Sequence, residues 1–223
     1  MPHNTFKIAL PIVMIALTLL AAPAGASPVV YISSTGWTAA VTNVITAPFT
    51  AQAGSAPYTE YNTSAGLTVG ETNFVGFTGE IGVYNLKVYN PAYIPSMERG
   101  SGPSLGGGWS PNNLMATLPA GGVYALAVNI ATEVQGRSVL ITLSSGETYT
   151  ITSPTNSTMM FWGITSDVAI TDIKFSATGT FTMIDNFSYA DIPGEETPEP
   201  IGLVLGATGL AAIWLARRMR RFC

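Results

Sequence analysis

Short stretches with an apolar period of two fill the chain between residues 27 and 191, and they constrain its fold most strongly. A period of two places every second side chain on one face of an extended strand. Residues 139–143 and 148–152 flank the polar turn 144–147, so we expect them to form a hairpin. A second hairpin is expected from residues 170–176 and 180–184, and single strands from residues 28–33, 83–89 and 123–130.

Turn residues separate these strands throughout, and the chain holds 23 Gly and 15 Pro. No stretch of residues 27–192 keeps a helical apolar period over three turns. Many short strands between such turns are typical of antiparallel sandwiches. We therefore predict an all-β fold, a jelly-roll-like antiparallel β-sandwich, over residues 27–191. The long irregular segment 90–113 is expected to be a loop with a function or without fixed structure.

The N-terminal 26 residues have the pattern of a secretory signal peptide. An apolar run at 8–20 follows a short basic start, and it is too short for a membrane span. Ala24 and Ala26 form an A-x-A cleavage motif just before Ser27. We predict that signal peptidase removes residues 1–26 and that the domain is exported.

The C-terminal end combines a spacer, an apolar helix and a basic cluster. Residues 192–200 are acidic and Pro-rich, which favours an extended spacer. Residues 201–216 carry no charge and would span about 24 Å as a helix, somewhat short of a bilayer core. Residues 217–223 form a basic tail that we expect to stay in the cytoplasm; its arginines are Arg217, Arg218, Arg220 and Arg221.

Pro198, Glu199 and Pro200, with the glycine-bearing helix and the arginines, resemble the PEP-CTERM sorting signal of Gram-negative bacteria. The same tail is also catalogued as the C-terminal domain of ice-binding proteins. The resemblance implies recognition by a membrane-embedded processing enzyme, the exosortase, and a link to exopolysaccharide and biofilm matrix. It implies a protein anchored in the inner membrane with its domain outside the cytoplasm, which reaches the cell surface or the medium after processing.

Three pieces of the domain, at 118–126, 161–167 and 184–187, also resemble an exported β-domain found ahead of many such tails. The family assigns that domain no activity. The resemblance therefore implies a fold and a location, and no ligand.

The ionisable residues exclude several kinds of chemistry. Cys223 is the single cysteine and His3 the single histidine, and His3 lies in the signal peptide. The exported domain therefore has no disulfide, no His/Cys zinc site and no Ser-His-Asp triad. Acids outnumber bases, 13 to 9 in the whole chain, so nucleic acid is not an expected partner. We expect no catalytic residue, no metal and no cofactor.

Exposed aromatic rings are the candidates for binding a carbohydrate, because they stack on sugar faces. Trp109 and Trp37 lie among Gly, Ser and Thr and are the main candidates; Tyr58, Tyr61 and Tyr93 lie in turn-like stretches. Trp162 and Phe161 begin an apolar strand and are expected in the core. The alternative to an inert surface protein is thus a carbohydrate-binding adhesin of the matrix.

Three weaker alternatives remain. A glycoside hydrolase would need paired carboxylates, and no sequence context marks such a pair. A calcium ion could bind Asp185, Asn186 and Asp167, but no Asp-rich calcium loop is present. Ice binding would use a regular Thr array, and the chain shows only short groups such as residues 148–152.

We predict that the protein recovered from cells with an active exosortase begins at Ser27 and ends near Pro198, since both segments are processing signals. Intact-mass spectrometry of protein from strains with and without the exosortase measures this. A mass that includes Arg221 and Cys223 in both strains would make the tail a permanent anchor.

Overall fold

A computed structural model describes residues 27–77, 84–92, 102–107, 113–156 and 158–193 of the 223-residue chain. Within these ranges, no helix has the length and apolar character needed to cross a membrane. The signal peptide 1–26, the sorting motif at 198–200, the apolar helix 201–216 and the basic tail 217–223 all lie outside the described residues.

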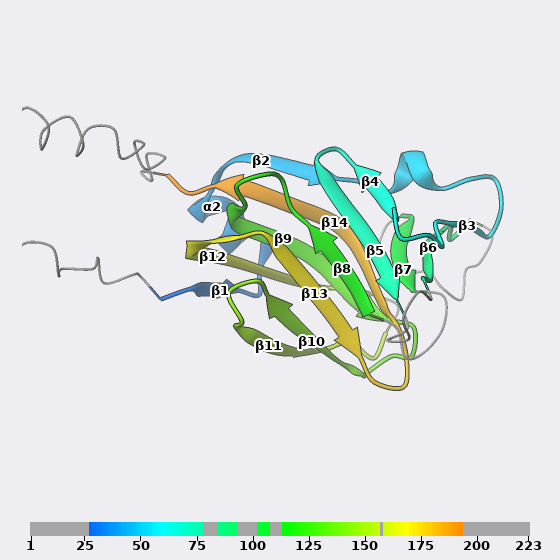
Figure 1. Ribbon diagram of the computed structural model, residues 1–223. Coiled ribbons are helices and arrows are strands. Elements are labelled where there is room, and N and C mark those ends of the chain that lie inside the picture. The colour runs from blue at the N-terminus through cyan, green and yellow to red at the C-terminus, as the bar shows by residue number, and fades with distance from the viewer. Residues whose placement is uncertain (1–26, 78–83, 93–101, 108–112, 157, 194–223) are drawn as a thin grey trace, which may run out of the picture.

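Two antiparallel β-sheets stack face to face, as the alternating pattern predicts (Figure 1). The larger sheet has the order β1-β12-β9-β14-β7-β6-β3, and β2 also pairs with β14. Its strands are β1 (Val29–Tyr31), β12 (Met160–Ile170), β9 (Val123–Thr132), β14 (Thr182–Asp191), β7 (Ser104–Gly107), β6 (Leu86–Tyr89), β3 (Tyr58–Glu60) and β2 (Thr42–Ala47).

The smaller sheet has the order β11-β10-β13-β8-β5-β4. Its strands are β11 (Thr148–Thr152), β10 (Ser138–Leu143), β13 (Asp172–Ala177), β8 (Asn113–Thr117), β5 (Thr72–Phe77) and β4 (Leu67–Val69). In Figure 1 this sheet lies in front of the larger one. The all-β sandwich prediction is therefore confirmed, whereas the finer jelly-roll assignment stays a prediction.

The first predicted hairpin is confirmed, because β10 and β11 pair from Ser138–Thr152 to Thr142–Thr148. The second predicted hairpin is wrong. β13 pairs with β10 and β8 in the smaller sheet, whereas β14 pairs with β9, β7 and β2 in the larger one. The connection at 178–181 passes from the smaller sheet to the larger one. The apolar faces of β13 and β14 therefore face each other across the core between the sheets.

One core fills the space between the sheets. Phe74 of β5 and Phe187 of β14 meet edge to face, with ring centroids 5.3 Å apart. Phe49, which precedes the 3₁₀ turn Thr50–Gln52, also packs edge to face with Phe74, with ring centroids 5.4 Å apart. Trp162 of β12 is 1% exposed and belongs to the same core, as predicted. Edge-to-face contacts of this kind stabilise beyond the area that they bury.

A short helix, α2 (Ser34–Ala40), covers part of the outer face of the larger sheet. Its Trp37 is 2% exposed and packs over the small residues Ala125, Ala127 and Ala190. The Trp37 indole N–H donates to the Ile164 carbonyl at 3.4 Å. The sequence did not predict this helix, because seven residues are too few to show a helical period.

Gly163 of β12 lies in close contact with Trp37 of the helix. A Cβ atom there would lie 2.9 Å from Trp37 Cδ1 and 3.2 Å from Ala127 Cβ. Only a residue without a side chain therefore fits beneath Trp37.

We predict that Gly163→Ala lowers the free energy of unfolding by about 1–3 kcal/mol, because the added methyl group overpacks the Trp37 contact. The matched control is Gly36→Ala in α2, where a Cβ would meet only ordinary contacts of 3.7 Å or more. That change should raise stability by about 0.5–1 kcal/mol through helix propensity. Urea unfolding measures both, and an unchanged Gly163→Ala protein would contradict the tight packing.

Candidate functional site

The outer face of the larger sheet carries a group of aromatic and charged side chains at its β3 end. Cross-strand register places Tyr58 of β3 opposite Tyr89 of β6, and Glu60 opposite Lys87. Directly opposed residues point to the same face of a sheet. Tyr58, Glu60, Lys87 and Tyr89 therefore form one group, which we call the aromatic edge.

Tyr58 is the exposed member of the aromatic edge, with 41% of its surface accessible. Its ring meets that of Tyr89 at a centroid distance of 6.3 Å and an angle of 61°. The Lys87 ammonium lies 4.1 Å from the Tyr58 ring centroid. An exposed ring is thus held in one orientation by an aromatic and a cationic neighbour.

Lys87 explains why this arrangement is stable. Its side chain is only 9% exposed, and removing an ammonium from water is costly unless the charge is paired. Glu60 accepts a salt bridge from Lys87 Nζ at 3.1 Å, and the Tyr58 ring supplies a cation–π contact. Both partners come from β3, so Lys87 fixes this three-residue edge strand on β6.

Tyr89 fixes the aromatic edge to the neighbouring parts of the sheet. Its hydroxyl donates to the Gly107 carbonyl at 2.6 Å, and its ring stacks on Phe181 at 5.7 Å and 11°. Burial, and secondarily the Glu133 carboxylate, raises the pKa of Tyr89 far above its usual value of 10.0. The neutral phenol therefore remains a hydrogen-bond donor at any physiological pH.

Asp185 of β14 lies on the same outer face and is buried, at 7% exposure. The strand has a register shift between Asp185 and Ser188, and Asn186 adopts a left-handed φ of 50°. The Asn186 backbone N–H donates to Asp185 Oδ1 at 2.7 Å, and its side-chain amide lies 3.2 Å from Oδ2. Asp185 and Asn186 therefore form a β-bulge inside strand β14.

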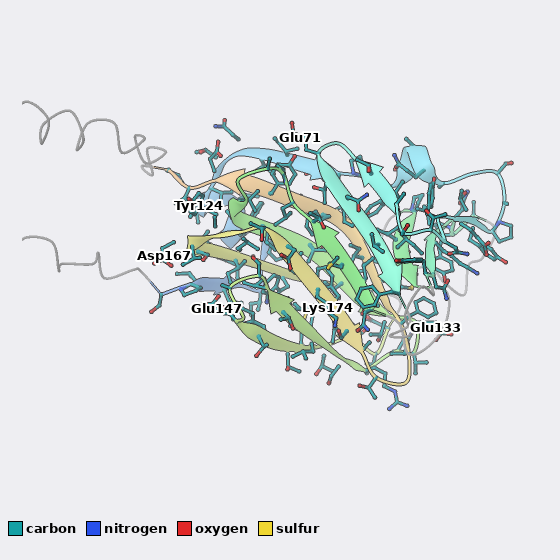
Figure 2. All side chains as sticks on the ribbon, in the orientation of Figure 1. Glu71, Tyr124, Glu133, Glu147, Asp167 and Lys174 are labelled. Atoms are coloured by element: carbon teal, nitrogen blue, oxygen red, sulfur yellow. The ribbon has the colours of Figure 1, made fainter. Side chains whose placement is uncertain are left out.

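Burial raises the pKa of Asp185 from 3.8, against the lowering effect of the Asn186 backbone hydrogen bond. A raised pKa is typical of a general acid, but a glycosidase also needs a second carboxylate nearby. Among the described residues, the causes of the raised pKa of Asp185 include no acidic side chain. Figure 2 shows Glu71 and Glu133 near different ends of the sandwich. No group of three His, Cys, Asp or Glu among the described residues is arranged to hold a metal ion.

The predicted site residues are only partly described. Trp37 is buried under α2, so the prediction that it stacks on carbohydrate is wrong. Trp109 lies outside the described residues, as do Ala24, Ala26, the sorting motif and the arginines. Ser27 is exposed at the start of the described chain.

Sequence reasoning named Tyr58 only as one of several tyrosines and missed its partners. Lys87 and Tyr89 alternate on one strand, which gives a weak signal of a shared face. Their pairing with β3 joins positions 31 and 27 residues apart, and the sequence shows no register for it.

The fold and these contacts define a two-layer antiparallel β-sandwich with an aromatic edge on the outer face of its larger sheet. No family model and no curated protein matches the chain. Family 29 carbohydrate-binding modules are among the solved structures that align with it. One is 15% identical, with a TM-score of 0.34, over 66% of this chain and 96% of that chain.

A CBM29-2 variant complexed with mannohexaose is 14% identical over 60% of this chain and 90% of its own, with a TM-score of 0.33. Another CBM29-2 variant, also 14% identical, aligns over 65% of this chain and 99% of its own, with a TM-score of 0.34.

Asp185 yields a prediction about pH. Because its folded pKa is raised, the native state holds this proton more tightly than the unfolded state. The ionised carboxylate therefore lowers stability at neutral pH, and that cost disappears as the pH falls toward 3.8. Asp185→Asn removes the acceptor of the Asn186 side-chain amide at every pH, and it removes the cost of the buried charge only where Asp185 is ionised. We therefore expect the stability of Asp185→Asn relative to the original chain to be more favourable at pH 7 than near pH 4. Denaturant unfolding at both pH values measures this; an equal difference at both would contradict it.

Proposed function

We propose that this is an exported bacterial envelope protein without catalytic activity of its own, whose β-sandwich binds a polysaccharide at the aromatic edge. The observation that carries the proposal is the exposed Tyr58 ring, held in one orientation by Lys87 and Tyr89. A ring that is already ordered loses little conformational entropy when a sugar stacks on it.

The flanking charges supply what a sugar needs besides stacking. Glu60 keeps about half of its side chain exposed while it pairs with Lys87. Its free lone pairs can accept hydrogen bonds from sugar hydroxyls, and the Tyr58 hydroxyl can donate or accept. An apolar ring beside exposed hydrogen-bonding groups is an arrangement suited to carbohydrate rather than to a purely apolar ligand.

The second part of the proposal concerns location. We propose that the tail anchors the protein in the inner membrane, and that an exosortase then sorts it to the cell surface or the matrix. The resemblance of residues 198–221 to a PEP-CTERM signal supports this. An exopolysaccharide of the same matrix would be the natural ligand of the aromatic edge.

The test is affinity electrophoresis of the full chain, in mild detergent, through gels that contain the exopolysaccharide of the host. We expect Tyr58→Ala to weaken retention about tenfold or more, from the stacking area lost. Tyr58→Phe keeps the ring and its cation–π contact and should retain most of the binding.

Tyr124→Ala is the matched control, since Tyr124 is a partly exposed tyrosine near the other end of the sandwich (Figure 2). Thermal unfolding of every variant separates lost binding from lost folding. Equal retention of the Tyr58→Ala protein and the original chain, with both folded, would exclude the aromatic edge as the binding site.

A further inference from the structure

Strand β11 is an edge of the smaller sheet, because β10 is its only neighbour among the described residues (Figure 1). It is five residues long, and its register with β10 has no shift. It contains no proline and no charged residue, only Thr148, Tyr149, Thr150, Ile151 and Thr152. A regular, uncharged edge strand is open to pairing with another strand.

The other sheet edges in the described part of the chain carry features that hinder such pairing. Strands β1, β3 and β4 have only three residues each. Strand β3 also carries the charged Glu60, and β2 has a register shift and a left-handed Asn43. Short length, charge and irregularity are the usual protections of edge strands. The absence of all three on β11 distinguishes it.

The hydrogen-bond pattern shows which backbone groups of β11 face outward. The Leu143 N–H donates to the Glu147 carbonyl at 3.0 Å, and the Ser153 N–H donates to the Arg137 carbonyl at 2.8 Å. In an antiparallel ladder, hydrogen-bonded and non-hydrogen-bonded pairs alternate. The backbone N–H and C=O groups of Thr148, Thr150 and Thr152 therefore point away from β10, toward the open side.

We propose that this edge pairs with β11 of a second copy of the chain, antiparallel and around a twofold axis at Thr150. The pairing joins Thr150 to Thr150 of the second copy, and Thr148 to its Thr152. The twofold axis repeats the second pair as Thr152 with Thr148 of the second copy. Each of the three pairs exchanges two backbone hydrogen bonds, about six in all. The two small sheets then become one continuous sheet across the dimer. This inference does not depend on carbohydrate binding.

Charges at the two ends of the hairpin favour a copy of the same chain as the occupant. In this register Glu147 lies opposite Ser153 of the second copy. Within that second copy, Arg137 is paired with Ser153 on the other side, where the Ser153 N–H donates to the Arg137 carbonyl. Glu147 and the second copy's Arg137 then share one face, with Cα atoms about 10 Å apart, two strand spacings.

Side chains of their length can close that gap, and the twofold axis makes the ion pair twice. Arg137 is exposed and has no ion-pair partner among the described residues. Figure 2 shows Glu147 on the same side of the sandwich as β11.

The experiment is sedimentation velocity of the full chain in mild detergent, over a range of protein concentrations. A five-residue pairing buries less surface than a standard interface, so we expect a dimer with a Kd of about 1–100 μM. Thr150→Pro removes an outward N–H that β10 does not use and should shift the protein to monomer. Thr150→Val changes the same side chain but keeps the outward N–H, so it is the matched control and should leave the dimer in place.

A charge swap makes the test specific. Arg137→Glu and Glu147→Arg should each weaken the dimer about tenfold, and the double variant should restore it. Circular dichroism confirms that each variant is folded. A monomer at every concentration would overturn the proposal. So would a dimer that ignores Thr150→Pro and the charge changes, because association would then use another part of the chain.

Discussion

The structure depends on one contact between its layers, the edge-to-face packing of Phe74 on Phe187. Phe74 comes from the smaller sheet and Phe187 from the larger one, and both are fully buried. Neither sheet can bury its apolar face alone. The Asp185–Asn186 bulge makes this contact possible, because it moves the inward positions of β14 from Ile184 to Phe187. The buried Asp185 carboxylate and the left-handed backbone of Asn186 therefore occur together with the Phe74–Phe187 contact.

The same bulge is a feature that the sequence did not predict. Local pairs were predictable: β10 and β11 are joined by a four-residue turn, and their alternation agrees with the observed register. The expected end of the last strand at residue 184 was too early, because the bulge breaks the period of two. The expected hairpin before it was wrong, since periodicity says which face is apolar but not which sheet a strand joins.

Surface predictions failed for a related reason. Trp37 has a sequence context typical of an exposed ring, but it is buried because Gly163, Ala125 and Ala127 leave a shallow surface for it. Those residues lie at least 85 positions away in the sequence. The aromatic edge likewise depends on the β3–β6 register. For Trp37 and Tyr58 alike, the residue type suggested a possible role. The residues that bury or expose each ring lie far away in the sequence.

The aromatic edge and strand β11 lie on opposite sides of the sandwich. The aromatic edge is at the β3 end of the larger sheet, whereas β11 lies near the β1 end, where Tyr149 packs on Trp162 of β12. A twofold pairing through β11 would therefore leave both Tyr58 rings uncovered and facing outward from the dimer. Two weak sites on one rigid particle bind a repeating polymer with an effective affinity above that of either site. Such a particle could also bridge two polymer strands, a property that a single site lacks.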